Sequence, residues 1–247
     1  MQAVALWRRV VAETLGSAFL AAVVIGSGIA AQRLSPGATG LELLENAAAT
    51  ATGLYAVILM FGPVSGGHVN PVVSLAAAAF GDLRWRDAAA YVPAQIAGCI
   101  GGAVVANVMF SLPAGLSTRS RASPAHFLSE VVATLGLLLL VFALGRSGRS
   151  RTTPAAVAAY IGAAYFFTSS TSFANPAITV GRMFSSSFAG IAPSSVPSFV
   201  GAQVLGGLAA CVAVLVLYPR LGPTPTGDAL PSAPVPVVAA EPEVTAR

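Results

Sequence analysis

Charged residues are scarce in this chain of 247 residues. Only 9% of the residues are Asp, Glu, Lys or Arg, 55% are hydrophobic, and the mean hydropathy is +0.78. Soluble domains carry about 25% charged residues. The scarcity of charge therefore excludes an ordinary soluble domain and indicates an integral membrane protein.

Lysine is absent, and histidine and cysteine occur twice each. The arginines are spread over predicted loops, which argues against a nucleic-acid-binding face. Cys99 and Cys211 lie in apolar surroundings and are interpreted as buried thiols. The sequence contains no nucleotide-binding loop, metal-ligand cluster or nucleophile triad. It therefore predicts neither an enzyme nor a cofactor or metal site.

Long stretches without a charged residue are present instead, at 14–32, 46–81, 88–118, 131–145, 152–181 and 183–219. A membrane-spanning helix needs about 20 mostly apolar residues. We predict six spans, at about 10–31, 46–62, 88–109, 127–145, 154–170 and 197–218. Several stretches are longer than one span requires, so they have room for a further segment inside the membrane. The Pro-rich residues 221–247 are predicted to form a disordered tail.

The two halves of the chain repeat each other. The repeated features are Glu13 and Glu130, Asn70-Pro71 and Asn175-Pro176, and the stretches "AQIAG" and "AQVLG" that begin at Ala94 and Ala202. Three predicted spans separate the copies, so the halves enter the membrane with opposite orientations, as in many transport proteins. We expect one domain, residues 1–220, built from inverted repeats of about 5–112 and 122–220, with a pathway at their interface.

Each Asn-Pro pair predicts the start of a helix. Asn is a favoured N-cap and Pro is favoured at the first helical position. Both pairs lie in the surplus parts of apolar stretches, so each predicts a short re-entrant half-helix. The partial positive charges of two N-termini that meet near the midplane would repel cations. The amides of Asn70 and Asn175 would offer donors to a neutral solute.

These residues resemble the major intrinsic protein family, the aquaporins and aquaglyceroporins, over about residues 5–220. The matching elements are "SGGHVNPVVSLA", "NPAITVGR", the paired glutamates and the two "AQxxG" stretches. The resemblance implies an all-α membrane protein with six transmembrane helices and two re-entrant half-helices, assembled as a homotetramer. It implies that the pore motifs are Asn70, Pro71 and Val72, and Asn175, Pro176 and Ala177. Val72 replaces the usual Ala and would place a larger aliphatic group beside the pore.

The resemblance also implies a constriction, the selectivity filter, in the outer half of the pore. Counting without gaps assigns it to Thr50, Ala163, Ser172 and Ile178, and a gap of two residues would give Thr52 instead of Thr50. The family usually has Arg at the position of Ile178. None of the four is charged or aromatic, so we expect a wide, arginine-free filter that passes solutes larger than water.

Four further residues have two interpretations each. Arg182, one helical turn beyond Ile178, either extends into the outer vestibule, or it reaches the membrane surface or pairs with an acidic group. His68 either lines the inner half of the pore or packs beside it. In the resembled family the counterparts of Glu13 and Glu130 support the re-entrant loops by hydrogen bonds to the backbone, whereas an ionisable group at membrane depth can also be a proton site.

The arginines also predict the orientation. With the N-terminus in the cytoplasm, eight arginines lie on the cytoplasmic side and four lie outside. The positive-inside rule therefore favours a multi-pass protein of the cell (plasma or inner) membrane with both termini cytoplasmic.

The function that these features favour is a passive channel for small uncharged solutes. The resemblance is greatest to bacterial family members associated with arsenic detoxification, which share "SFANPA", and it implies metalloid hydroxides such as arsenite, glycerol-like polyols, and water as a further candidate. Its partners would be these solutes and membrane lipid, with no nucleic acid. Two alternatives stay open: a proton-coupled secondary transporter that uses Glu13 or Glu130, and a closed, structural member of the family.

Overall fold

The computed structural model describes residues 4–219, and these residues form helices and no strand. The main helices are α1 (Leu6–Leu34), α2 (Thr39–Ser65), α4 (Trp85–Met109), α5 (Pro124–Arg146), α6 (Thr153–Phe167) and α8 (Val196–Leu217). Two short helices are α3 (Pro71–Ala79) and α7 (Pro176–Gly181), and three 3-10 turns are η1 (Ser150–Thr152), η2 (Arg182–Phe184) and η3 (Pro193–Ser195). The tail predicted at 221–247 lies outside the described residues.

Five helices are long and apolar enough to cross a membrane: α1, α2, α4, α5 and α8. The prediction of an all-α integral membrane protein is therefore confirmed. α6 has 15 residues, two fewer than the predicted span 154–170. Its length of about 22 Å is less than the thickness of the hydrocarbon core, about 30 Å. The chain leaves the helix at Thr168, whose ψ is 137°. Soon afterwards Ser170 is tied to α5 through Glu130.

α2 is longer than predicted and begins at Thr39, not near residue 46. The predicted span stopped at Glu45, but both Glu42 and Glu45 lie within the helix, and Glu42 is in its first turn. An acidic side chain there interacts favourably with the helix dipole. The charge therefore belongs to the start of the helix and does not mark its boundary.

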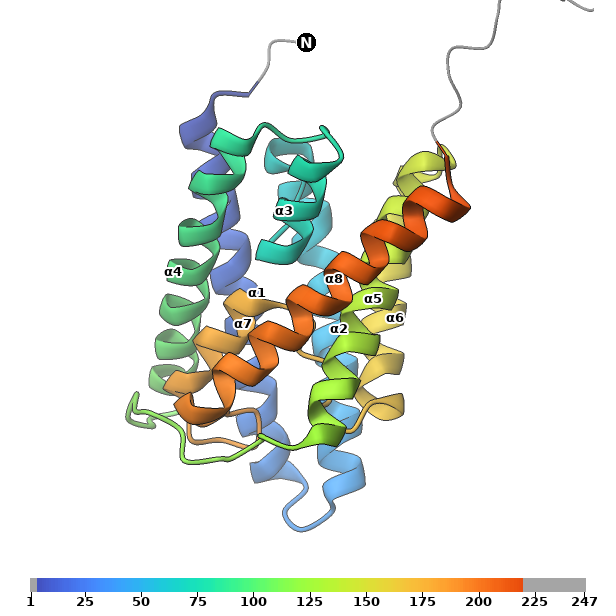
Figure 1. Cartoon of the computed structure of the whole chain (residues 1–247). Helices are drawn as coiled ribbons and strands as arrows, with labels where there is room; N and C mark the ends of the chain where they lie inside the picture. The colour runs from blue at the N-terminus through green and yellow to red at the C-terminus, as the bar shows by residue number, and fades with distance from the viewer. Residues whose placement is uncertain (1–3, 220–247) are drawn as a thin grey trace, which may run out of the picture.

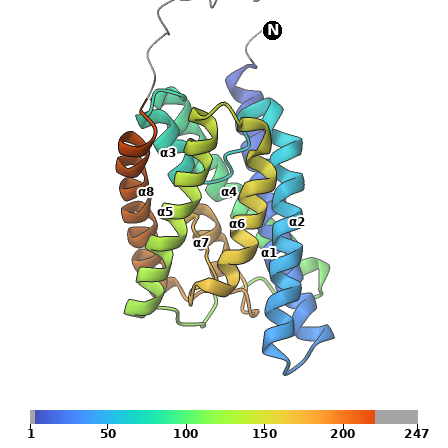
Figure 2. The ribbon, with the colours of Figure 1, turned by 90° about the vertical axis from the view of Figure 1, so that its right-hand side faces the viewer.

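The helices pack in two matching groups (Figures 1 and 2). α1 packs along α4 and α2, α5 packs along α8 and against α6, and α2 joins the groups by its contact with α6. The short helices α3 and α7 lie inside, α3 in the upper and α7 in the lower half of Figure 1, and each contacts both α4 and α8. Both ends of the described chain lie at the same, upper end of the molecule.

Glycines allow the closest helix contacts. A Cβ on Gly98 of α4 would collide with the backbone carbonyl oxygen of Thr14 in α1, and a Cβ on Gly206 of α8 would collide with that of Val131 in α5. Small residues at such crossings let helix backbones approach closely in membranes. Both glycines end the repeated "AQxxG" stretch, so this part of the repeat serves the same packing in both halves.

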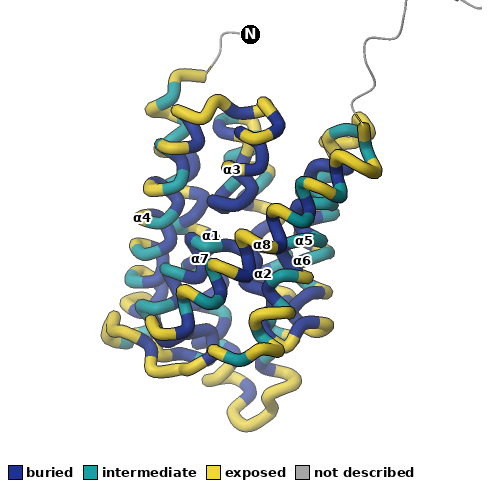
Figure 3. Tube along the Cα trace, viewed as in Figure 1, coloured by how far each residue is buried: buried dark blue, intermediate teal, exposed yellow. Residues whose placement is uncertain are grey.

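Burial follows this arrangement. Figure 3 shows α3, α7 and the inward sides of the long helices as mostly buried. Large apolar side chains are exposed on the outer faces, among them Phe19, Val105 and Leu208. Such an outer surface suits contact with lipid chains, because hydrocarbon solvates apolar side chains and leaves polar ones unsatisfied.

Candidate functional site

Asn70 and Asn175 cap the two short helices. The Asn70 Oδ1 accepts a hydrogen bond of 3.0 Å from the Val72 backbone N–H, and the Asn175 Oδ1 accepts one of 2.9 Å from the Ala177 N–H. Both Asn residues are extended, and each is followed by Pro at the first helical position. The local preferences of Asn for the N-cap and of Pro for the first helical position thus explain where both helices begin.

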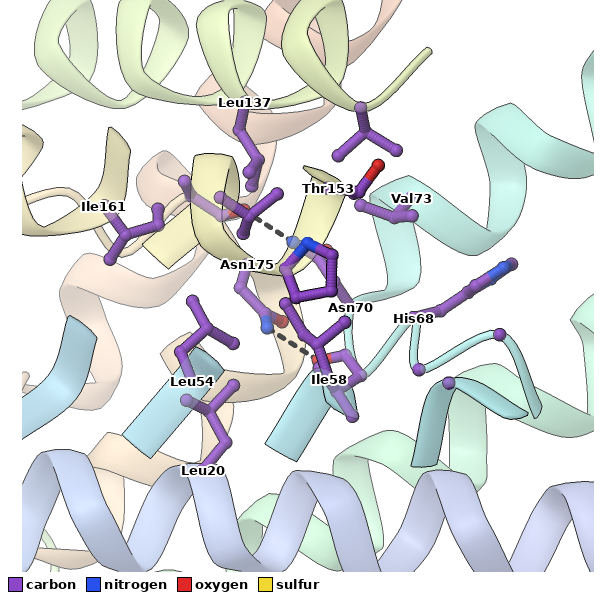
Figure 4. Close-up of a pocket in the computed structure, with 18 of the residues that line it drawn as sticks. Leu20, Leu54, Ile58, His68, Asn70, Val73, Leu137, Thr153, Ile161 and Asn175 are labelled. Carbon is purple, nitrogen blue, oxygen red and sulfur yellow. Dashed lines mark hydrogen bonds between the residues drawn. The ribbon is translucent and has the colours of Figure 1, made fainter. Parts of the chain in front are cut away.

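The same two side chains also join the halves of the molecule. The Asn70 Nδ2 donates to the Ala174 carbonyl at 2.8 Å, and the Asn175 Nδ2 donates to the Val69 carbonyl at 2.7 Å. Figure 4 shows both bonds beside the cavity. The N-termini of α3 and α7 therefore meet at one point, with each Asn bonded to the loop that precedes the other.

The residues that accept these bonds have unusual backbone conformations. Val69 and Ala174 have φ values of 42° and 46°, and Ser172 has 46°. A left-handed conformation costs a residue other than glycine about 1–2 kcal/mol. The loops need additional support to hold it.

Glu13 supports the first loop. Its Oε1 accepts from the Ser65 hydroxyl at 2.6 Å and from the His68 N–H at 3.0 Å. Its Oε2 accepts from the Val69 N–H and the Gln95 Nε2, both at 2.7 Å. The carboxylate is fully buried, and it fixes one of the residues with positive φ directly.

Glu130 supports the second loop with the same set of bonds. Its Oε1 accepts from the Ser170 hydroxyl at 2.6 Å and from the Phe173 N–H at 2.9 Å. Its Oε2 accepts from the Ala174 N–H at 2.9 Å and from the Gln203 Nε2 at 2.7 Å. The two glutamates thus make corresponding bonds in the two halves, to backbone N–H groups as the resemblance implied.

Gln95 and Gln203 are members of this site whose role was missed in the sequence. Each amide also donates to a hydroxyl of a short helix. Gln95 donates to Ser74 of α3 and Gln203 donates to Thr179 of α7, both at 2.9 Å. The signal was present in the repeated "AQxxG". A glutamine within an apolar span needs a buried partner, and the glutamate in the same half is the natural candidate.

A cavity of about 580 Å³ lies beside the two loops. Its walls are mainly apolar, and Figure 4 shows Leu20, Leu54, Ile58, Val73, Leu137 and Ile161 around the two Asn side chains. The lining extends from Asp82 and Arg151 at one end to Thr50 and Arg182 at the other. An apolar cavity with few, well-placed polar groups is typical of a small-molecule site.

Three of the four predicted filter residues line this cavity: Thr50, Ser172 and Ile178. Ala163 does not, because it is exposed on the outer face of α6. Tyr165 takes its place in the lining, and its hydroxyl lies 3.1 Å from the Thr50 hydroxyl. Two residues along a helix correspond to a turn of about 200°, so the ungapped count selected the opposite face. The prediction that Ala163 lines the cavity is therefore wrong, and an aromatic residue, Tyr165, lies there instead.

Val72 also lies elsewhere than expected. It is buried but does not line the cavity. A Cβ placed on Gly207 of α8 would collide with the Val72 Cγ1. The larger side chain at this position thus faces α8, where a glycine leaves room for it. The expectation that it stands beside the pore is wrong.

Arg182 is 1% exposed and lines the cavity. Its Nε donates to the Ala189 carbonyl, and its guanidinium carbon lies 3.5 Å from the centre of the Phe173 ring. Within residues 4–219 its Nη2 has no hydrogen-bond partner. Arg182 thus lies in the wall of the cavity, and its burial contradicts the interpretation that places it at the membrane surface. Among residues 4–219 it forms no salt bridge with an acidic group. The cavity is therefore not arginine-free.

A second arginine lies near Arg182. Arg121 donates from Nε to the Gly190 carbonyl at 2.8 Å and from Nη2 to the Phe188 carbonyl at 2.9 Å. Its guanidinium carbon lies 5.2 Å from the centre of the Phe173 ring. Burial, together with the positive charge of Arg182, lowers the pKa of Arg121 to about 9. This end of the cavity is thus electropositive.

His68 lines the cavity near the opposite end. One ring nitrogen, Nδ1, lies 3.0 Å from the Ser74 hydroxyl, and the ring meets that of Tyr91 edge-on with 5.6 Å between centres. Its position therefore agrees with the first of its two interpretations, a residue that lines the cavity.

Known proteins resemble this chain in sequence and in fold. The profile of the family described as "Major intrinsic protein" matches residues 1–173. "Aquaglyceroporin AqpS" of Rhizobium meliloti (strain 1021) is 47% identical over 211 residues, which cover 85% of this chain and 90% of that protein. "Aquaporin-9" of Rattus norvegicus is 34% identical over 169 residues, covering 58% of this chain and 57% of that protein. The X-ray structure of the aquaglyceroporin from Plasmodium falciparum, 18% identical, matches 85% of this chain and 96% of that chain with a TM-score of 0.67, which shows a shared fold.

Proposed function

The chain belongs to the major intrinsic protein family, and from this premise we propose which solutes it conducts and how it selects them. It is a membrane channel for small neutral solutes such as glycerol, and not an enzyme. The proposal is that it conducts undissociated metalloid hydroxides such as arsenite and glycerol-like polyols passively, with water as a further candidate.

The observation that carries this proposal is the pair of Asn amides in an otherwise apolar cavity. An amide nitrogen has two N–H groups, and in Asn70 and Asn175 one of them donates to a loop carbonyl. The second N–H of each can donate to a solute oxygen. Donors flanked by apolar walls suit an uncharged solute with hydroxyl groups, because a charged one would lose its hydration without compensation.

The residues at the outer end of the cavity support passage of solutes larger than water. Ile178 stands where the family usually has Arg, and its side chain is shorter and uncharged. Thr50, Tyr165 and Ser172 add hydroxyl groups that can donate or accept. In pores of this kind, diameter and the lining donors and acceptors determine selectivity. We assign these four residues to the filter, with Tyr165 in place of Ala163.

The two alternatives are less well supported. A proton carrier needs a carboxylate that can exchange protons, but all four oxygens of Glu13 and Glu130 accept two hydrogen bonds each. Protonation would require some of these bonds to break. A closed structural member would lack a solute path, whereas this chain has a cavity of about 580 Å³ beside both Asn residues.

We further propose a homotetramer in the plasma or inner membrane with both termini cytoplasmic. The arginine distribution supports this orientation. The corresponding bonds of Glu13 and Glu130 support inverted repeats at about 5–112 and 122–220. Light scattering coupled to size-exclusion chromatography measures the subunit number, and a mass of one subunit would contradict the tetramer.

Stopped-flow light scattering on proteoliposomes tests the proposed function. Glycerol, urea, arsenous acid and water are compared with empty vesicles, with and without a pH gradient. We expect faster entry of glycerol and arsenous acid than into empty vesicles, independent of the gradient. Accumulation driven by the gradient would favour the carrier. Rates equal to those of empty vesicles for all four solutes would favour the closed member.

A further inference from the structure

Two residues at the outer end of the cavity differ in chemistry: Ile178 is apolar, and Arg182 is charged. We propose that Arg182 provides the barrier to cations and protons while Ile178 sets the width of the pore, so that charge selection and size selection are separate. This inference rests on the proposed channel function. It assigns to Arg182, which comes from η2 rather than α7, a specificity-determining role.

The position of the guanidinium carries the first step. Its Nε is bonded to the Ala189 carbonyl and its guanidinium carbon lies 3.5 Å from the centre of the Phe173 ring, so the group is held to the wall of the cavity. A side chain fixed in this way contributes charge without extending across the pore. An arginine at position 178 would begin on α7 and extend into the space that Ile178 now borders.

Two unpartnered polar atoms carry the second step. Among the described residues, the Arg182 Nη2 and the Ser172 Oγ are buried without a hydrogen-bond partner, and both residues line the cavity. Buried polar atoms are nearly always bonded to protein or water. Both atoms have almost no accessible surface, so they lie within the wall of the cavity. The Arg182 guanidinium bonds to the Ala189 carbonyl, and among residues 4–219 no carboxylate lies within salt-bridge distance of it. Its positive charge is therefore not neutralised by an ion pair and acts on the adjacent cavity.

Electrostatics carries the third step. A unit cation about 5 Å from a guanidinium, at an effective dielectric constant of about 20, is disfavoured by about two orders of magnitude in occupancy. Burial of Arg182 limits screening by salt. Arg121, on the same Phe173 ring, adds positive charge nearby. A neutral solute experiences no such barrier.

The test uses the full chain in proteoliposomes with an entrapped pH dye. A potassium diffusion potential drives protons inward, and glycerol entry is measured on the same vesicles. Relative to wild type, we expect Arg182→Met to increase proton influx at least about tenfold and Arg182→Lys to increase it less, because Lys keeps the charge. Arg33→Met is the matched control. Arg33 is exposed in the last turn of α1 and lies on Phe110, outside the main cavity, so the proton influx and glycerol rate of this variant should equal those of wild type.

A double variant, Ile178→Arg with Arg182→Met, separates charge from width. It moves the cation to the usual position of the family and should restore proton rejection while lowering glycerol entry. Size-exclusion chromatography checks folding, because a folded variant elutes at the same volume as wild type. If Arg182→Met elutes differently, Arg182→Gln is used in its place.

The outcomes distinguish this inference from the proposed function. If wild type does not conduct glycerol, the proposed function fails whatever Arg182 does. If wild type conducts glycerol and a folded neutral variant at position 182 admits protons no faster than wild type, the role of Arg182 is overturned. If the double variant rejects protons but conducts glycerol at the wild-type rate, the assignment of width to Ile178 is overturned.

Discussion

Replacing Glu130 by Gln would remove the charge that holds the second loop while keeping the size of the side chain. The carboxylate accepts four hydrogen bonds, two at each oxygen, from Ser170, Phe173, Ala174 and Gln203. Glutamine has one oxygen and one NH₂ group in their place. The NH₂ group faces two donors, so two of the four bonds are lost.

The size of the effect follows from these bonds. Hydrogen bonds to a charged group contribute about 1.5–3 kcal/mol each, so losing two costs about 3–6 kcal/mol. Ala174 and Ser172, both with φ of 46°, then lose support for a conformation that costs about 1–2 kcal/mol per residue. At about 2–4 °C per kcal/mol for a chain of this size, the loss of the two bonds should lower the melting temperature by about 6–24 °C.

The assay combines thermal unfolding of the detergent-solubilised protein with glycerol entry into proteoliposomes. Glu45→Gln is the control, because Glu45 accepts a single side-chain bond, of 2.7 Å from the Ser35 hydroxyl, and Gln can accept the same bond. The control should melt and conduct as wild type. A Glu130→Gln variant with wild-type melting temperature and glycerol rate would refute the supporting role. A stable variant that loses only a response to a pH gradient would favour the proton carrier.

Three further predictions concern the cavity and its packing. Ile178→Arg should lower glycerol entry at least about tenfold and water entry less, since it narrows the pore; an unchanged glycerol rate in stopped-flow measurements would contradict the filter assignment. Tyr165→Ala should speed the entry of polyols larger than glycerol, whereas Ala163→Leu, on the outer face of α6, should leave solute rates unchanged; equal effects of the two changes would mean that Tyr165 does not limit the pore. Gly207→Val should destabilise the protein by about 1–3 kcal/mol through overpacking against Val72, and a thermal melt at the wild-type temperature would exclude that contact.

Much of the fold could be predicted because its signals are local. The absence of charge over long stretches predicted the membrane class, and Asn followed by Pro predicted where α3 and α7 begin. These features depend on the preferences of adjacent residues. The repeat of Glu13 and Glu130 added long-range information, because the same residue in both halves indicated the same environment.

The errors arose where a residue's role depends on the direction in which its side chain points. α6 is apolar both on its outer face and on the side that faces the cavity, so its hydrophobic pattern does not distinguish Ala163 from Tyr165. The sequence left the position of Arg182 open, because this position is determined by contacts with the Ala189 carbonyl and the Phe173 ring. Both contacts depend on loop paths that no periodic pattern in the sequence encodes.

The reciprocal bonds between the Asn side chains and the opposite loops limit how this protein can move. The Asn70 amide is bonded to Ala174, and the Asn175 amide to Val69. A rocking motion of one repeat against the other, as in alternating-access carriers, would break both bonds at once. We therefore expect the contact between the two loops to persist, and any opening or closing of the cavity to take place at its ends, near Asp82 and Arg151 or near Thr50 and Arg182.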